Sequence, residues 1–233
     1  MRIFAISDLH LSFQSSKPMD LFGSHWENYE ERIALDWNLR VGADDIVLVA
    51  GDISWAMKME ETRLDFEYIS KLKGKKIIIR GNHDYWWKSI SKIRETLPKN
   101  IIALQNDSIK IDDVTFAGTR GWRVPERRQV QDVEDKKIYE REIIRFNLAL
   151  KDAREKAGPS GKIVTMLHYP PFNATRDDSP FTRMCEKYGV SACVYGHLHG
   201  NSVRAEQFVE KNGVAYYLTS CDLVNHKVVE IKL

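Results

Sequence analysis

The first hundred residues of this chain alternate short apolar runs with longer amphipathic stretches. Residues 3–6, 46–50 and 77–79 are uninterrupted apolar runs of strand length. Short apolar runs that alternate with helices predict a mainly parallel sheet, whose strands are buried on both faces. In the stretches between them, apolar residues recur every three or four positions, as in helices that bury one face. The recurring residues are Trp26, Tyr29, Ile33 and Trp37, then Phe66, Ile69 and Leu72, then Trp87, Ile90, Ile93 and Leu97.

The second half of the chain has a different pattern, which predicts a second sheet. Apolar positions on both sides of residues 112–113 predict an antiparallel hairpin. A long amphipathic helix is predicted over residues 132–157, ended by Gly158. Ser179, which a proline follows, predicts the start of another helix that ends at Gly189. Further strands are predicted at residues 163–167, 192–195, 216–219 and 228–231.

Length and composition restrict the classes of protein to which the chain can belong. Its 233 residues suffice for one sizeable domain, and we expect a single domain over 1–233 with 121–160 as a candidate cap-like insertion. The formal net charge of +2 is too small to indicate bulk affinity for nucleic acid or membranes. No apolar run reaches the roughly 18 residues of a membrane span, and the acidic Asp8 comes too early for a secretory leader.

The cysteines predict a reducing environment. Their odd number and their spacing are not typical of a disulfide framework, so we expect buried thiols and a cytoplasmic protein. They are Cys185, Cys193 and Cys221. The sequence does not indicate an oligomeric state.

Metal-capable side chains follow five of the predicted strands. Ligands of open α/β sheets bind outside the carboxyl ends of the strands, so we expect these side chains to form one site. A glycine precedes Asp52, Asn82 and His197, where the backbone must turn sharply or approach an ion closely. In strand order, the side chains belong to Asp8 and His10, to Asp52, to Asn82, His83 and Asp84, to His168, and to His197 and His199.

The residue types in this set indicate the kind of metal. Imidazole, carboxylate and amide oxygen suit manganese, iron or zinc, and the set contains no cysteine of the kind that holds a structural zinc ion. The candidates are too many for one ion, whereas two ions about 3.5–4 Å apart would use them all. A single histidine at a strand end is usually structural, but coincidence does not account for so many in one pattern.

The ordered series of motifs resembles that of the calcineurin-like metallophosphoesterases. The motifs are Asp8-x-His10, Gly51-Asp52, Gly81-Asn82-His83-Asp84, His168 and Gly196-His197-x-His199. They span residues 8–199, so the resemblance covers most of the chain. It implies a four-layer α/β/β/α sandwich, with two facing mixed sheets and helices outside. It also implies divalent-metal-dependent hydrolysis of a phosphomonoester or phosphodiester by a metal-bridging hydroxide.

The resemblance further implies a role for each residue. Asp52 would bridge two divalent ions. His83 would lie over the phosphate and stabilise its charge or protonate the leaving oxygen. Asp84 would orient His83 through a hydrogen bond. The first ion would be held by Asp8, His10 and His199, and the second by Asn82, His168 and His197.

Two other functions stay open on the sequence alone. One is a catalytically weak, metal-bound interaction scaffold, although the presence of His83 and Asp84 argues against it. The other is a nuclease, which the nearly balanced charge does not favour. The phosphorylated substrate is therefore of unknown class, with nucleic acid less favoured than a smaller ester.

Several residues outside the metal-ligand set also carry expectations, and some of them allow more than one interpretation. Arg120 is a candidate phosphate clamp, because a guanidinium matches phosphate oxygens, or else a surface arginine. The tryptophans at 86–87 are candidates to line a substrate wall, although one of the two is expected to belong to the core. Arg80 is expected to make a structural ion pair. His25 and His226 are expected to lie outside the site, at a helix start and in a turn or strand edge.

Overall fold

The computed structural model of the chain describes residues 1–15, 17–200 and 203–233. One sheet is built from the N-terminal strands, joined by the last strand of the chain. Its strands are β1 (Ile3–Ile6), β2 (Ile46–Val49), β3 (Lys75–Ile78), β4 (Ile101–Ala103) and β11 (Val229–Ile231). Their order is β11-β1-β2-β3-β4, and all neighbours are parallel except β11 and β1. The predicted parallel sheet of the first hundred residues is therefore confirmed.

The other sheet is mixed. Its strands are β5 (Asp107–Ile111), β6 (Val114–Thr119), β7 (Lys162–Leu167), β8 (Ala192–Tyr195), β9 (Phe208–Lys211) and β10 (Val214–Leu218). Their order is β5-β6-β7-β8-β10-β9, with parallel pairing from β6 to β10 and antiparallel pairing at both edges. The predicted hairpin is the pair β5 and β6, and Asp112 takes the left-handed φ of 52° in its turn.

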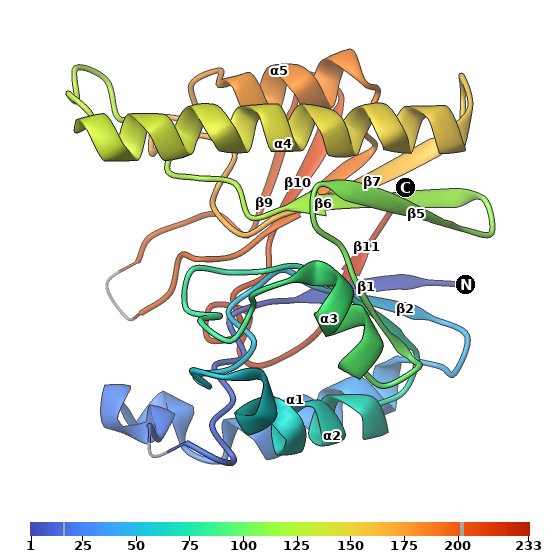
Figure 1. Cartoon of the computed structure of the whole chain (residues 1–233), viewed down its shortest axis with the longest axis vertical. Helices are drawn as coiled ribbons and strands as arrows, with labels where there is room; N and C mark the ends of the chain where they lie inside the picture. Colours follow the sequence, from blue (N-terminus) through green and yellow to red (C-terminus); the bar gives the residue numbers. More distant parts are fainter. Residues whose placement is uncertain (16, 201–202) are drawn as a thin grey trace.

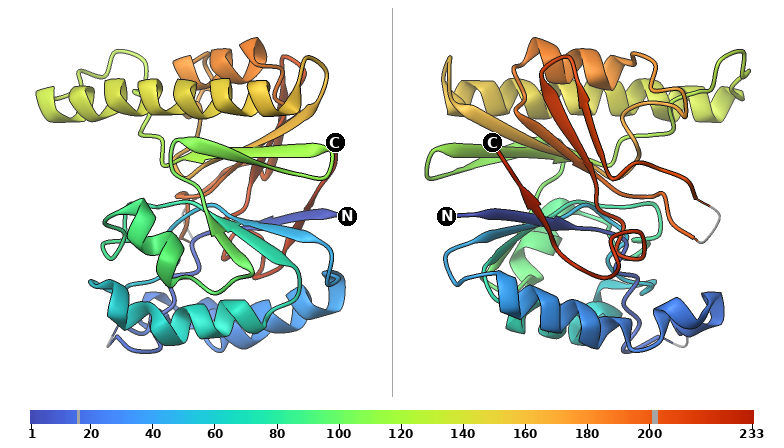
Figure 2. Two further views of the ribbon diagram at one scale, coloured as in Figure 1. Left: turned by 45° about the vertical axis from the view of Figure 1, so that its right-hand side comes forward. Right: turned by 180° about the vertical axis from the view of Figure 1, so that it is seen from behind.

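Helices cover the outer faces of the two facing sheets, which gives four layers and confirms the predicted sandwich (Figures 1 and 2). The helices of the first half are α1 (Tyr29–Arg40), α2 (Arg63–Lys71) and α3 (Ile90–Thr96), with short 3-10 helices at Met19–Phe22, Ser24–Trp26 and Met59–Thr62. Those of the second half are α4 (Val133–Ala157) and α5 (Pro180–Lys187). Among the described residues, no helix is long and apolar enough to cross a bilayer.

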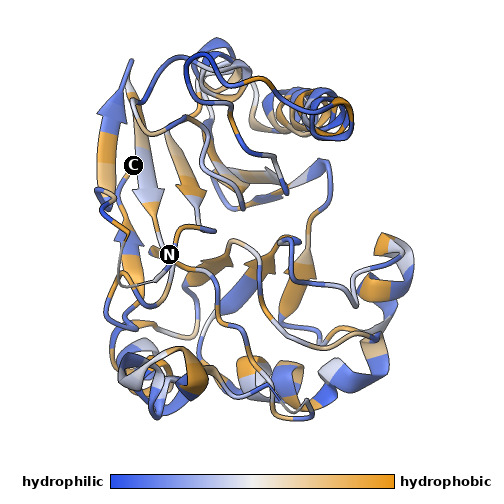
Figure 3. Ribbon diagram, turned by 90° about the vertical axis from the view of Figure 1, so that its left-hand side faces the viewer, coloured by the Kyte–Doolittle hydropathy of each residue, from blue (hydrophilic) through white to orange (hydrophobic). Residues whose placement is uncertain are grey.

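Side-chain alternation along the strands divides the apolar residues among three buried clusters. On β1, Phe4 and Ile6 join the cluster with α1 and α2, whereas Ile3 and Ala5 join the cluster between the sheets. A third cluster joins the second sheet to α4, which contributes Phe146, and to α5. Both faces of each sheet are thus covered, and Figure 3 shows apolar residues on the strands and on the helices.

The ends of the two later helices have the predicted causes. Asp132 accepts a bond from Asp135 N at 2.8 Å and caps α4, and Gly158, with φ of 79°, ends it. Ser179 Oγ accepts from Phe181 N at 3.0 Å, and proline occupies the first turn of α5. Of the segment 121–160, residues 133–157 form the layer over the second sheet. Whether the segment acts as a cap stays a prediction.

Some local predictions are wrong. Trp26 lies in a 3-10 helix, because Asn28 with φ of 50° separates it from α1, and Trp87 precedes α3. Strand β10 ends at Leu218, one residue early, and β4 and β9 were not predicted. β4 is only three residues long, and β9 is a partly exposed edge strand with two charged residues. β9 therefore lacks the apolar run on which strand prediction depends, whereas β4 is wholly apolar and was missed because it is short.

Candidate metal centre

The carboxyl ends of β1, β2, β3, β7 and β8 bring the predicted ligand residues to one edge of the sandwich. After β1 and β2 the chain segments are hydrogen bonded, since Asp8 N donates to Gly51 O at 3.0 Å. The second sheet is tied to the same place, because His168 Nδ1 lies 2.9 Å from Ala50 O. The metal-capable side chains after five different strands therefore share one region, as the sequence predicts.

Close contact with the ligand side chains explains two of the glycines that precede them. A Cβ at Gly81 would lie 2.1 Å from Asp52 Oδ1, and a Cβ at Gly196 would lie 2.5 Å from Asp8 Oδ2. The sequence predicted a sharp turn or a close approach to an ion at these positions, and the close approach in the structure is to the carboxylates of two ligands. Asp8 and Asp52 themselves have positive φ values of 57° and 51°. Such conformations cost energy in residues other than glycine, and they often occur at functional sites.

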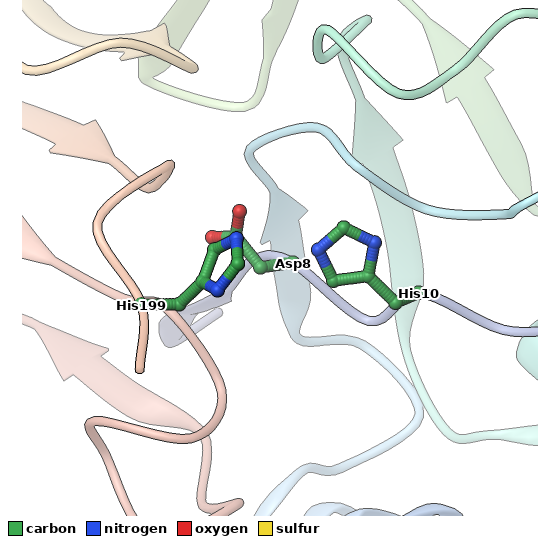
Figure 4. A group of neighbouring side chains, drawn as sticks. All are labelled: Asp8, His10 and His199. Atoms are coloured by element: carbon green, nitrogen blue, oxygen red, sulfur yellow. The ribbon is translucent and has the colours of Figure 1, made fainter. Parts of the chain in front are cut away.

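Asp8, His10 and His199 form the first group of ligands. One ligand atom from each lies within 4.8 Å of the others, and the three side chains converge in Figure 4. Asp8 and His10 are buried, whereas His199 is partly exposed. The ring centroids of His10 and His199 are 5.3 Å apart. The three residues predicted to hold one ion thus lie together in space.

Asp52 lies beside both the first group and His168. Its Oδ2 is 3.9 Å from His10 Nε2 and 3.4 Å from His168 Nε2. Asp8, Asp52 and His168 also offer ligand atoms within 4.8 Å of one another. The other oxygen of Asp52 accepts a hydrogen bond from His83 N at 2.8 Å. That bond fixes the carboxylate so that Oδ2 faces the histidines.

Asn82 completes a second group of ligands. Its Oδ1 lies 2.8 Å from His168 Nε2 and 2.9 Å from His197 Nδ1. These three residues come from loops after β3, β7 and β8, yet their ligand atoms meet at one point. All seven predicted ligands therefore fall into two adjoining groups, with Asp52 between them.

Buried polar atoms without partners show that this region suits a cation. Both ring nitrogens of His10 and the Oδ2 atom of Asp52 are buried without a hydrogen bond among the described residues. Leaving such an atom unsatisfied costs about 1–3 kcal/mol. A divalent ion would satisfy Asp52 Oδ2 and one ring nitrogen of His10. Imidazole, carboxylate and amide oxygen are suitable ligands for manganese, iron or zinc.

Burial and charge set the protonation of the ligands in the metal-free protein. Burial lowers the pKa of His10 and of His197 to about 3, so both are neutral and have a free lone pair. Burial by itself would lower the pKa of His168, but the charge of Asp52 outweighs it and raises the pKa to about 9. His168 and Asp52 thus form an ion pair, in which a metal ion would take the place of the proton.

Asp84 does not orient His83, so this prediction is wrong. Asp84 Oδ1 accepts from Ile53 N at 2.9 Å and from Trp86 Nε1 at 3.0 Å, and Oδ2 accepts from Gly81 N at 2.7 Å. His83 Nδ1 has no hydrogen-bond partner among the described residues. Asp84 therefore joins the loop after β2 to the loop after β3. Burial raises the pKa of Asp84 to about 6, and the charge of Asp52 contributes to the shift.

Trp55 is the neighbour of His83 that the sequence did not reveal. Its ring centroid lies 4.6 Å from that of His83 and 4.7 Å from that of His10, on which it stacks with an interplanar angle of 22°. Trp55 is half-buried and follows Asp52 by three positions. That proximity to a predicted ligand was the available signal, but no pattern in the sequence showed which way the indole points.

Residues outside the ligand set have structural contacts. Arg120 Nη2 lies 3.7 Å from Glu142 Oε1, and the guanidinium covers the ring of Trp122. Its role as a phosphate clamp stays a prediction. Arg80 makes no ion pair among the described residues, contrary to expectation.

The remaining aromatic and histidine predictions have mixed outcomes. Trp86 and Trp87 are both buried in the core, so the alternative that they line a substrate is wrong. His226 lies in a turn, as predicted, and its Nε2 is 2.9 Å from the carbonyl oxygen of His25. His25 lies in the 3-10 helix Ser24–Trp26 ahead of α1, is half-buried, and belongs to neither ligand group.

Solved structures share this fold at low sequence identity. A protein of unknown function from Aquifex aeolicus is 14% identical, with a TM-score of 0.52, and the match covers 98% of this chain and 95% of that one. Phosphopantetheinyl hydrolase from Mycobacterium tuberculosis is 15% identical, with a TM-score of 0.53 and coverage of 99% and 95%. TT1561 from Thermus thermophilus is 10% identical, with a TM-score of 0.56 and coverage of 99% and 98%. No curated protein gave a significant match.

The sequence itself matches one protein family over most of its length. Residues 1–201 fit the family described as calcineurin-like phosphoesterase. That range contains every ligand residue of the two groups described above. The family is one of metal-dependent phosphoesterases, which agrees with the carboxylate, imidazole and amide groups that converge here. The chain therefore belongs to the calcineurin-like phosphoesterase family.

Proposed function

We propose that the protein hydrolyses a phosphomonoester or phosphodiester with two divalent metal ions. The observation that carries the proposal is the meeting of Asn82 Oδ1 with His168 and His197, next to the group of Asp8, His10 and His199. One such group would suit a single structural ion. Two groups that share the neighbourhood of Asp52 suit the two-metal chemistry of phosphate ester hydrolysis.

This proposal assigns each ligand side chain to one or both of the ions. Asp8, His10 and His199 would hold one ion, Asn82, His168 and His197 would hold the other, and Asp52 would contribute to both. Bound together, the ions supply charge neutralisation at the phosphoryl group and a more acidic water. His168 keeps its Nε2 directed at the site because its Nδ1 faces Ala50 O at 2.9 Å. The ions are manganese, iron or zinc.

His83 is the proposed catalytic residue. It is half-buried and lies next to His10, with 5.6 Å between ring centroids. Burial lowers its pKa, so that it is neutral near pH 7 in the metal-free protein and has one N–H to donate. We propose that it donates a hydrogen bond to the phosphoryl group or protonates the leaving oxygen. The phosphorylated substrate, the role of Arg120 and a cytoplasmic location are also proposals.

Hydrolysis assays test the function: phosphate release for the monoester, 4-nitrophenol release for the diester, and gel electrophoresis for DNA cleavage. The protein is stripped of metal, reloaded with manganese, iron or zinc, and given phenyl phosphate, bis(4-nitrophenyl) phosphate and single-stranded DNA. We expect hydrolysis of at least one small ester, and a loss of about 100-fold or more in kcat for His83→Ala with unchanged metal content. His25→Ala, which changes a histidine outside the ligand groups, is the control. Metal-loaded wild type and His83→Ala that are equally inert would favour the scaffold, and a preference for DNA would favour the nuclease.

A further inference from the structure

A cavity of about 460 Å³ adjoins the ligand groups on the side of His197. Its walls come from residues 123–131 and Asp135 at the start of α4, from 170–176 after β7, and from the end of β8 with the two residues 197–198. Residues 203–206 and Val209 of β9 complete them. His197, one of the three residues proposed to hold the second ion, itself lines the cavity, so the cavity is adjacent to that group of ligands. This volume is typical of sites for small organic ligands.

The surface of the cavity has a large apolar part. Phe172 and Tyr195 line it, with 5.7 Å between their ring centroids, and Phe172 also packs on Tyr216 at 5.4 Å. Phe172 and Tyr195 belong to the buried cluster that joins the second sheet to α4 and α5, so packing fixes their positions. Val124 and Leu198 add aliphatic surface. An occupant can therefore bury apolar groups against rigid walls.

The charges around the cavity cancel. Its lining contains three arginines and three acidic residues. Arg123 pairs with Asp135 at 2.9 Å, and Arg176 pairs with Glu206 at 2.7 Å. A second phosphate or a chain of phosphates would need an excess of cations, which the described lining does not provide. An occupant without net charge fits this surface better.

We propose that the cavity binds the organic part of the substrate, and that this part is an uncharged, largely apolar group of small-molecule size. The inference rests on the proposed function, because it assigns the other half of the same substrate. The proposal excludes nucleic acids and polyphosphates as substrates, because they carry negative charge on both sides of the scissile bond. The segment at 123–131 then contributes to specificity, since it forms one wall of the cavity.

Binding of phosphonates, whose carbon–phosphorus bond resists this hydrolysis, tests the proposal without requiring turnover. The manganese-loaded protein is titrated calorimetrically with methylphosphonate, hexylphosphonate and 6-phosphonohexanoate. We expect hexylphosphonate to bind at least about tenfold more tightly than methylphosphonate, because its chain leaves water. The terminal carboxylate of 6-phosphonohexanoate should remove this gain. Equal affinity for the methyl and hexyl compounds, absence of binding, or tighter binding of the carboxylate would each overturn the proposal.

A variant that fills the cavity shows whether the hexyl chain binds there. Ala205 is half-buried in its wall, and Ala205→Trp should bring the affinity ratio of hexylphosphonate to methylphosphonate close to one. Ala174→Trp, at the exposed rim, is the second variant if the first does not fold. Ala43→Trp places the same indole on an exposed turn before β2 and should keep the wild-type ratio. An unchanged ratio in both cavity variants would contradict the assignment.

The two proposals can fail separately. A protein that binds hexylphosphonate in the expected way but hydrolyses neither hexyl phosphate nor the diester hexyl 4-nitrophenyl phosphate contradicts the proposed function and leaves the cavity assignment standing. Hydrolysis of methyl and hexyl phosphate with equal kcat/KM, together with equal phosphonate affinities, supports the function and overturns the cavity assignment.

Discussion

The indole of Trp55 lies against the imidazole of His83, with 4.6 Å between their ring centroids. Lys17 covers the same indole, its Nζ 4.9 Å from a ring centroid. Trp55 Nε1 also points to the sulfur of Met19 at 3.2 Å. The backbone N of His83 donates to Asp52 Oδ1 at 2.8 Å, but its ring has no hydrogen bond to Asp84, so aromatic packing sets the orientation of the ring. Trp55 is therefore a positioning residue for the proposed catalytic histidine.

Replacement of Trp55 should impair turnover more than metal binding. We expect Trp55→Ala to lower kcat by about tenfold, because an imidazole that loses its packing partner is less often in the productive geometry. Trp55→Phe should restore most of the rate, since a smaller ring can still stack. Steady-state kinetics with metal content measured on the same samples checks this. A normal kcat for Trp55→Ala, or a loss fully explained by missing metal, would contradict the positioning role.

Asp84 should matter for the stability of the loops more than for chemistry. Asp84→Asn cannot accept from all of its donors, and it turns an N–H₂ group toward a backbone N–H or the indole N–H. We expect it to lower the free energy of unfolding by about 2 kcal/mol. His83→Ala, one residue away, should change stability little. Urea denaturation of the metal-free variants measures both, and equal stabilities for the two would show that Asp84 does not hold the loops.

Local patterns predicted the layers, whereas contacts between distant segments decided the details of the site. The apolar runs before Asp8 and Asp52 are short, clear signals, and each ends where a ligand begins. The partner of His83 depends on how the loop after β2 folds back, and nothing in the sequence near Trp55 encodes that direction. The wrong pairing of Asp84 has the same origin, because four backbone and indole donors compete for its two oxygens.

The pH dependence of stability should change when Asp152 is replaced. Partial burial alone would raise the pKa of Asp152, but hydrogen bonds from Lys156 and Ser108 outweigh it and hold the pKa below its usual value. The folded chain therefore releases this proton more readily than the unfolded chain. The contribution to stability is complete above the unfolded value of about 3.9 and is lost as the pH falls through the lower folded value.

The measurement compares wild type and Asp152→Asn by urea denaturation after chelator treatment, so that metal loss does not intervene. At pH 7 the variant should be less stable by about 1 kcal/mol, a modest figure because the carboxylate is partly exposed. The difference should shrink below about pH 4. Asp113→Asn, in the exposed turn between β5 and β6, is the control. A difference that is constant with pH, or that grows in acid, would contradict this account.

Counting the bound metal ions shows whether these seven side chains hold two ions. The chelator-treated protein is incubated with manganese and desalted, and the metal is measured by mass spectrometry against protein concentration. We predict about two ions per chain for wild type and for His25→Ala, and about one for Asn82→Ala, which removes a ligand from only one group. No more than one ion on wild type, or two ions retained by Asn82→Ala, would contradict the two-metal site.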